Sequence, residues 1–296
     1  MSFRLEMLQA ARLAPQLLGD AADLVRAFLR RNMLPDGAFP DRAGRPDLYY
    51  TVFGMEGLMA LHAEPPWPQF AAWLDTFGDG AGLDFVHLSC LARCWSAVPV
   101  SWQNLSPARR TALLDRVLAF RTPDGGFNQR PAAPACTAYG CLLGWAAHLD
   151  LGAPLPPAES LTTCLAALRT PDGGYANEPG LQFGAVPAAA AAVALHRHLR
   201  LTAPPGTGQW LLAQQHPEGG FLALPGAPMP DLLSTAVALH ALDGMQVSFA
   251  ATKDEILDFI DTLWSAEGGF HGNWADDTLD VEYTYYGLLA LGHLAL

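Results

Sequence analysis

Acidic residues gather in the last part of the chain with the types and spacing that metal binding or acid catalysis uses. The group comprises Asp276, Asp277, Asp280 and Glu282. Oxygen ligands suit Mg²⁺ better than Zn²⁺, which prefers Cys and His, and a carboxylic acid that stays protonated in an apolar pocket is a proton donor. The alternative is helix capping, because Asp280 precedes an apolar stretch and negative charge stabilises a helix start. The same place before other apolar stretches is held by Asp47, Asp84 and Asp231, so both interpretations stay open.

A second candidate metal site combines Asp84, His87 and Cys136, whose side chains are the ligand types of many zinc sites. Cys90 and Cys94 follow His87 at helical spacing and share its face. The alternative is a histidine packed in the core beside buried thiols, which behave as small apolar side chains. The sequence leaves both interpretations open.

Aromatic side chains form the third group with a chemical use. They are Tyr50, Phe53, Tyr139, Phe183, Trp274, Tyr283 and Tyr286. Ring faces attract cations, so an aromatic wall suits a cavity in which carbocations form, and ordinary core packing is the alternative. Arg42 and Arg45 lie in a loop, where their forked guanidinium groups suit a diphosphate unless solvent or carboxylates hold them.

The elements that position these residues follow from a turn that recurs six times, at intervals of about 43 to 49 residues. The turns are Asp36-Gly37-Ala38, Asp79-Gly80-Ala81, Asp124-Gly125-Gly126, Asp172-Gly173-Gly174, Glu218-Gly219-Gly220 and Glu267-Gly268-Gly269. Glycines at such turns adopt the positive φ that ends a helix. An apolar stretch follows each turn, which indicates a helix buried on all sides.

Each repeat therefore predicts one half-exposed outer helix, a Gly turn, a loop and one buried inner helix. Such repeats form an open solenoid or a closed ring, and the apolar last helix lacks the polar cap that a solenoid needs. We predict an all-α fold, an α/α toroid (α6/α6 barrel) of six helix–Gly turn–helix repeats. We expect a single domain, residues 1–296, with repeats that start near residues 20, 68, 107, 156, 205 and 253.

The composition argues against several classes of function. Of 296 residues, 51% are hydrophobic and 16% charged, and 17 Lys and Arg stand against 29 Asp and Glu, for a net charge of −12. Such a surface repels nucleic acid, and no apolar run has the length of a transmembrane helix. The five cysteines are odd in number and fall in apparent helices, as expected for reduced thiols of a cytoplasmic protein.

The Gly-Gly-aromatic turns and two further segments resemble one family. Residues 39–54 (FPDRAGRPDLYYTVFG) resemble the repeat that contributes a zinc-binding histidine in the α/α toroids of protein prenyltransferase β subunits, which are relatives of squalene and other terpenoid cyclases. Residues 280–286 (DVEYTYY) resemble the repeat that contributes a zinc-binding Asp-x-Cys motif. Asp280 keeps the family's Asp, whereas Glu282 stands in the place of the Cys and Tyr50 in the place of the His. Trp274 and Asp277 stand where the family's Arg and Lys hold the diphosphate, and the cyclases' Asp-x-Asp-Asp motif is not present.

The resemblance implies that an isoprenoid, as a prenyl diphosphate, binds in a central aromatic cavity, with prenyl transfer as the leading activity. Asp280 and Glu282 would hold a divalent metal, Mg²⁺ or Zn²⁺, and Tyr283 would contact the diphosphate. The residues implied to contact the substrate are Tyr50, Phe53, Tyr139, Trp274, Tyr286, Arg42 and Arg45. A helical partner subunit is implied as well. Two alternatives stay open: a non-catalytic binding or scaffold subunit, and a terpenoid cyclase-like enzyme that uses a carboxylic acid.

Overall fold

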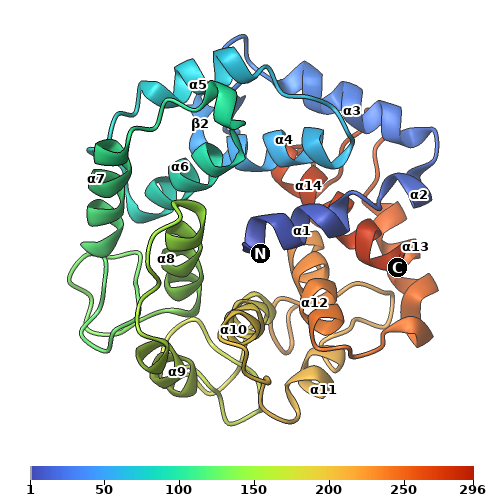
Figure 1. Cartoon of the computed structure of the whole chain (residues 1–296). Helices are drawn as coiled ribbons and strands as arrows, with labels where there is room; N and C mark the ends of the chain where they lie inside the picture. The colour runs from blue at the N-terminus through green and yellow to red at the C-terminus, as the bar shows by residue number, and fades with distance from the viewer. Residues whose placement is uncertain (1) are drawn as a thin grey trace.

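The computed structural model describes residues 2–296, which form two concentric rings of helices (Figure 1). The outer ring consists of α3 (Ala21–Asn32), α5 (Trp67–Asp75), α7 (Pro107–Leu118), α9 (Ala158–Ala167), α11 (Thr207–Leu212) and α13 (Lys253–Thr262). The inner ring consists of α4 (Leu48–Ala60), α6 (Phe85–Ala97), α8 (Ala138–Asp150), α10 (Val186–His198), α12 (Leu232–Gly244) and α14 (Val281–Leu294). The sequence prediction of an all-α protein with an α/α toroid is confirmed.

The ring is closed by contacts between its last and first repeats. Each inner helix packs on the next, and α14 packs on α4. In the outer ring, Gly268 has a φ of 93°, and a Cβ on it would lie 2.2 Å from the backbone oxygen of Leu24 in α3. Only glycine allows this approach, so the last turn is seated directly against the first outer helix.

Five of the six inner helices begin with a side chain that accepts the backbone N–H three residues on. These N-cap residues are Asp47, Asp84, Thr137, Asp231 and Asp280. Since the cap oxygen satisfies an otherwise unpaired N–H group, the capping interpretation of these aspartates is correct. Capping also fixes a common register, so side chains at the same distance from each cap are equivalent around the ring.

The first helix, α1 (Phe3–Ala11), lies across the middle of the ring (Figure 1). It packs on α14 and α4, and Gly292 of α14 lets the backbone of Ala10 approach so closely that a Cβ would lie 2.0 Å from its oxygen. Because Gly292 is near the end of α14, α1 covers the carboxyl ends of the inner helices. The sequence prediction gave α1 no role.

Small elements complete the chain. They are α2 (Pro15–Leu18), the antiparallel strands β1 (Phe39–Pro40) and β2 (Pro46–Asp47), and the 3₁₀ helices η1 (Val100–Trp102) and η2 (Ala250–Thr252). Within residues 2–296, no helix combines the length and the apolar character needed to cross a membrane.

Candidate functional site

The inner ring encloses a cavity of about 480 Å³. Its lining residues fall mainly at the second, sixth and ninth positions after the N-cap of each inner helix, and we call these sets the first, middle and third belts. The volume is within the range of sites that hold small molecules. The three belts therefore describe the cavity from the amino ends of the inner helices to α1.

The middle belt is complete and almost wholly apolar. Its members are Phe53, Cys90, Leu143, Ala191, Val237 and Tyr286, one from each inner helix. The rings of Phe53 and Tyr286 lie 5.4 Å apart between centroids. Ala188, Ala190 and Ala194 of α10 also line the cavity, so small side chains create the space on the side away from these rings.

The first belt contains an acid. Tyr49, Tyr139, Pro187 and Leu233 line the cavity at this level, and Glu282 holds the same position in α14. Glu282 is only 8% exposed, and its Oε1 accepts a hydrogen bond of 2.5 Å from the hydroxyl of Tyr49. The carboxyl group therefore stands directly behind a residue of the cavity wall.

Burial controls the protonation of this pair. Loss of solvent raises the pKa of Glu282 from 4.5 to about 7, although the hydrogen bond from Tyr49 opposes the rise. Burial and the neighbouring Tyr286 and Glu282 raise the pKa of Tyr49 as well, which keeps its hydroxyl protonated. Near neutral pH, Glu282 is thus divided between carboxylic acid and carboxylate, as a proton donor in an enzyme requires.

The third belt contains polar residues of the wall, beside Ala146 and Ala194. Arg93 and His240 line the cavity here, and Glu56, at the same level of α4, accepts from Arg93 at 2.8 and 2.6 Å through its two oxygens. Burial, with the nearby His293, lowers the pKa of His240 to about 3. The Nδ1 atom of His240 lies 3.0 Å from Nε2 of His293, so a neutral imidazole held by a second imidazole faces the cavity.

Asp150, at the end of α8, adds a carboxyl group to the polar end of the cavity. Burial raises its pKa from 3.8 to about 6, against the opposing effect of the positive charges on Arg93 and Arg4. The cavity is therefore apolar in its middle and has ionisable groups at both ends.

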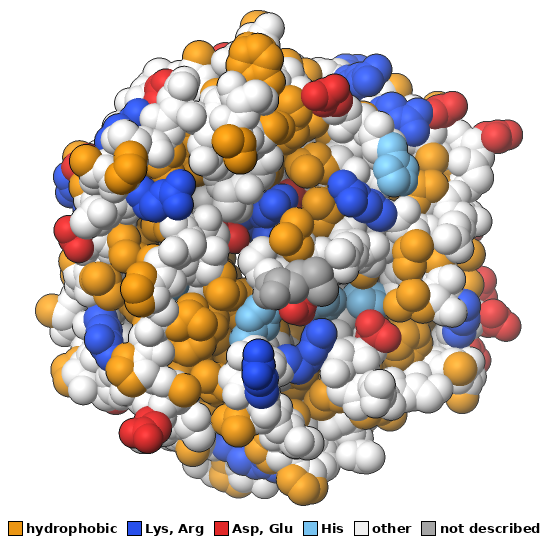
Figure 2. All heavy atoms as spheres, in the orientation of Figure 1, with side chains coloured by type: hydrophobic (Ala, Val, Ile, Leu, Met, Phe, Trp, Pro, Cys, Tyr) orange, Lys and Arg blue, Asp and Glu red, His pale blue; other side chains and the backbone are white. Residues whose placement is uncertain are grey.

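Helix α1 closes the polar end. Phe3 and Met7 line the cavity, and the ring of Phe3 lies 3.8 Å from that of His198. Glu6 pairs with His198 at 3.2 Å and with Arg197 at 3.5 Å. Figure 2 shows this face of the molecule, where basic, acidic and histidine side chains gather around the centre.

The residue set at Asp280 does not fit a metal ion. Nε of Arg42 donates to Oδ2 of Asp280 at 2.9 Å, and Nη2 of Arg42 lies 2.8 Å from carboxylate oxygens of both Asp280 and Asp276. A guanidinium group already supplies the positive charge here and would repel a metal cation. Glu282 is turned toward Tyr49 instead, so the geometry favours an ion pair over the predicted site at Asp280 and Glu282.

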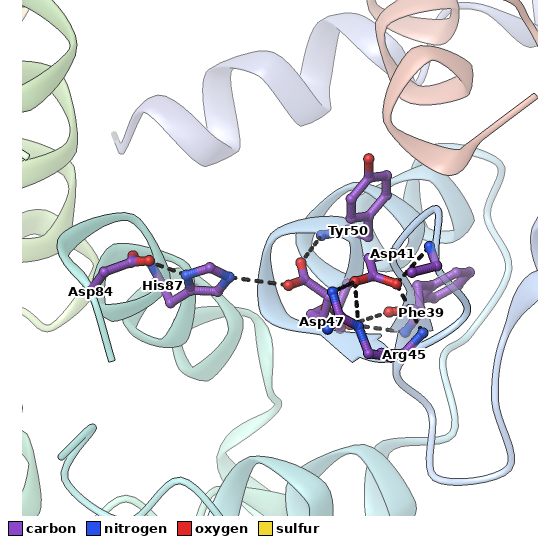
Figure 3. A network of polar contacts seen from close by, with 9 residues as sticks. Phe39, Asp41, Arg45, Asp47, Tyr50, Asp84 and His87 are labelled. Carbon is purple, nitrogen blue, oxygen red and sulfur yellow. Dashed lines mark hydrogen bonds and ion pairs between the residues drawn. The ribbon is translucent and has the colours of Figure 1, made fainter. Parts of the chain in front are cut away.

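The alternative metal set is separated in the structure. His87 contacts Asp84 through Nδ1 at 2.9 Å and Asp47 through Nε2 at 3.1 Å, a bridge between the starts of α6 and α4 (Figure 3). These carboxylates raise the pKa of His87 to about 9, which favours the imidazolium form, and they occupy both of its ring nitrogens. Cys136 precedes the cap of α8, whereas His87 lies inside α6, so the two do not hold equivalent positions; Cys136 lies with Cys141 and Cys164.

The other predicted contact residues divide into two groups. Phe53, Tyr139 and Tyr286 line the cavity. Tyr50, Tyr283, Trp274, Arg42 and Arg45 are not among the lining residues. Trp274 is 41% exposed and packs on Phe259 and His216, and Arg45 is an exposed partner of Asp41, as Figure 3 also shows.

Sequence reasoning missed Tyr49, Arg93 and His240. Each has a signal in the sequence once the caps are aligned, because Tyr49 is at the position of Glu282 and the other two share one position. The position of a residue relative to the N-cap of its inner helix therefore identifies the residues of the cavity wall better than the residue type does.

A family model described as the prenyltransferase alpha-alpha toroid domain matches residues 75–222 and 231–295. No curated protein matches the sequence. These matched residues cover most of the ring, including five of the inner helices.

Solved structures show the same fold at low sequence identity. A type II terpene cyclase from Scytonema, in complex with its substrate geranylgeranyl dihydroxybenzoate, has a TM-score of 0.60 and 13% identity, with 97% of each chain covered. Protein geranylgeranyltransferase-I from Candida albicans, complexed with GGPP, has a TM-score of 0.55 and 15% identity, covering 98% of this chain and 82% of that one. A protein from Actinoplanes has a TM-score of 0.60 and 15% identity, with 94% and 99% covered.

Proposed function

The chain belongs to the prenyltransferase alpha-alpha toroid family, and on that premise we propose that it binds an isoprenoid chain in the central cavity and cyclises it by proton transfer from Glu282. The observation that carries the proposal is the pairing of Glu282 with Tyr49 at the cavity wall, with the pKa of Glu282 at about 7. An alkene is protonated only by an acid that keeps its proton until the substrate is bound and water is excluded.

The first step moves one proton. When Glu282 is protonated, its O–H donates to the Tyr49 oxygen, which frees the Tyr49 proton to face the substrate. The Tyr49 hydroxyl then gives its proton to the terminal double bond, and the carboxylic proton of Glu282 passes to the Tyr49 oxygen. The alkene becomes a tertiary carbocation, and Glu282 becomes a carboxylate that accepts a hydrogen bond from the restored hydroxyl. No carbon–oxygen or phosphorus–oxygen bond breaks, so the reaction needs neither a leaving group nor a metal.

The wall of the cavity suits the steps that follow. The carbocation is attacked by the next double bond, which forms a ring, and the faces of Phe53, Tyr139 and Tyr286 stabilise the moving positive charge. The final carbocation loses a proton, and the neutral imidazole of His240 is an acceptor at the cavity wall. The catalytic group in contact with substrate is Tyr49, and Glu282 acts through it.

The polar end of the cavity would bind the end of the substrate that is opposite to the protonated double bond. With the alkene at the first belt, a polar headgroup lies near Arg93, Asp150 and His240. These residues offer both hydrogen-bond donors and acceptors, which suits a hydroxyl or carboxyl group on the isoprenoid.

Prenyl transfer receives less support from the geometry. A diphosphate needs cations that are free to bind it, whereas Arg42 is paired with Asp276 and Asp280, and Arg45 with Asp41. The carboxylates at this end of the ring would repel the diphosphate further.

The experiment separates cyclase, transferase and scaffold. Farnesol, geranylgeraniol and their diphosphates are titrated against the protein by calorimetry, and each mixture is then analysed by mass spectrometry. We expect the alcohols to bind at least as well as the diphosphates and to yield cyclic isomers of unchanged mass. Binding without a new product would support the scaffold alternative, release of diphosphate would support transfer, and no binding would overturn the proposal.

A further inference from the structure

Three cysteines from separate elements meet beneath the Gly turn of the third repeat, away from the cavity. Cys136 lies before α8, Cys141 in the first turns of α8 and Cys164 in the outer helix α9. Their sulfur atoms all lie within 4.8 Å of one another, and the side chains are 0%, 0% and 1% exposed. All three are free thiols.

Sister repeats fill this place in another way. A Cβ on Gly126 would touch the three cysteines, whereas a Cβ on the equivalent Gly174, Gly220 or Gly269 would touch one large side chain of the next outer helix. Those side chains are Trp210, Phe259 and Phe28. In the third repeat, the aromatic ring is thus replaced by Cys164, and two more sulfur atoms fill the volume that the ring leaves.

Cys141 occupies a position that accepts a backbone N–H group in the sister repeats. At the equivalent position of three sister helices, a threonine hydroxyl accepts the backbone N–H of the aromatic residue after the Gly turn; these are Thr51, Thr235 and Thr284. Cys141 takes the place of the threonine and, like Cys136 and Cys164, directs its side chain into the space beside Gly126. A thiolate is the form that binds metals.

We propose that Cys136, Cys141 and Cys164 form a buried site for a thiophilic cation, Zn²⁺ or Cu⁺. Thiolate sulfur is the preferred ligand of both ions. With metal–sulfur bonds of about 2.3 Å, three sulfur atoms of a tetrahedral zinc site stand about 3.8 Å apart, so the cluster needs a contraction of about 1 Å at most. Binding releases the protons of the three thiols, and Zn²⁺ with three thiolates carries a net charge of −1.

The site is independent of the predicted family zinc ligands and of the proposed reaction. It lies between α8 and α9, whereas Asp280 and Glu282 lie at α14. A metal here would fix α9 to the start of α8 and thereby stabilise the third repeat.

The test uses the full chain, and its thiols are first counted in the denatured protein without reductant. The protein is then reduced with a thiol-free reductant and freed of metal. Co²⁺ is added as an optical probe for the zinc arm, and Cu⁺ is titrated against a chromophoric chelator in the other arm. We expect five thiols, one bound ion and, with Co²⁺, the sulfur-to-metal charge-transfer absorption of thiolate ligands. Cys164→Ser should weaken binding by more than about 100-fold, since even lost second-shell partners cost 10–100-fold, whereas Cys94→Ser should leave it unchanged.

A second variant distinguishes the loss of metal ligands from a loss of folding. The triple variant Cys136→Gly, Cys141→Ala, Cys164→Trp copies the fourth repeat, in which Gly184, Ala189 and Trp210 hold these places. We expect this variant to fold and to bind no metal. Binding that survives in the folded triple variant, no binding by the wild-type protein, or two missing thiols that reveal a disulfide would each overturn the proposal.

Discussion

The hydroxyl of Tyr49 donates to Oε1 of Glu282 across 2.5 Å and joins the first inner helix, α4, to the last, α14. The pair therefore exists only because the ring closes. It brings an acid of raised pKa to the wall of an apolar cavity, although the two residues are 233 positions apart in the sequence. The proposed chemistry rests on this contact.

Replacing the acid should stop turnover and leave binding intact. Glu282→Gln keeps the shape and the oxygen that accepts from Tyr49 but carries no transferable proton. We expect cyclisation to fall by about 10²- to 10⁴-fold, measured as product formed per minute, with the Kd of the isoprenoid alcohol changed little. Asp277→Asn, at an exposed carboxylate of the loop before α14, is the matched control. Equal loss in both variants, or full activity in Glu282→Gln, would contradict the role of Glu282.

The rate of cyclisation should fall as the pH rises through about 7. The proton donor is the protonated form of Glu282, whose pKa burial raises to about 7, so each pH unit above that value removes about nine-tenths of the active form. Binding measured over the same range serves as the control. A rate that rises between pH 6 and 9 would show that a base, not this acid, limits the reaction.

The same pKa has a consequence for stability. Folding raises the pKa of Glu282 above its usual 4.5, so the folded protein holds this proton more tightly and loses stability as the pH rises from 4.5 to about 7. Glu282→Gln lacks the titration. We therefore expect the unfolding free energy of Glu282→Gln minus that of the wild type, measured by urea denaturation, to increase from pH 4.5 to about 7. A difference that stays constant over this range would argue that the pKa of Glu282 is not raised.

The sequence predicts the features that depend on local backbone geometry and misses those that depend on contacts between distant segments. The Gly turns predict the ring because each turn is a local backbone requirement, and the aspartates before the inner helices predict caps for the same reason. Glu282 is named as a possible acid from its place beside Asp280. Its partner Tyr49 is missed because the sequence analysis selects the neighbouring Tyr50 as the cavity residue. Adjacent residues of a helix face different directions, and it is Tyr49 that lines the cavity.

Two other features depend on long-range packing. Cys136 is grouped with Asp84 and His87 by ligand type, whereas the caps show that Cys136 lies before α8 and His87 lies inside α6. Helix α1 lies outside the repeat, so no periodicity predicts that Phe3 and Met7 close the cavity. Family resemblance predicts the fold correctly, but it directs attention to a metal where Arg42 pairs with Asp280.

Removing the Tyr49 hydroxyl separates its two effects. Tyr49→Phe keeps the ring in the wall but loses the hydrogen bond that lowers the pKa of Glu282. We expect a slower rate together with a shift of the falling limb of the pH–rate profile to higher pH. An unchanged rate in Tyr49→Phe would indicate that Tyr49 only shapes the wall and would contradict its role as proton donor.

Filling the cavity should prevent binding at little cost in stability. Ala191 belongs to the middle belt, whereas the next residue of α10, Ala192, is 0% exposed and outside the cavity lining. Ala191→Leu should raise the Kd of the isoprenoid alcohol at least tenfold with a small change in Tm, because the new methyl groups enter empty space. Ala192→Leu should lower the free energy of unfolding by about 1–3 kcal/mol through overpacking. Unchanged binding in Ala191→Leu would place the ligand elsewhere.

The most direct test of proton-initiated cyclisation is the reaction in D₂O with geranylgeraniol, followed by mass spectrometry of the product. Glu282 and Tyr49 exchange their protons with solvent, so the account predicts a cyclic product with one deuterium bound to carbon at the end first protonated, and no such product from Glu282→Gln. A cyclic product without carbon-bound deuterium, or one formed equally by Glu282→Gln, would contradict the account.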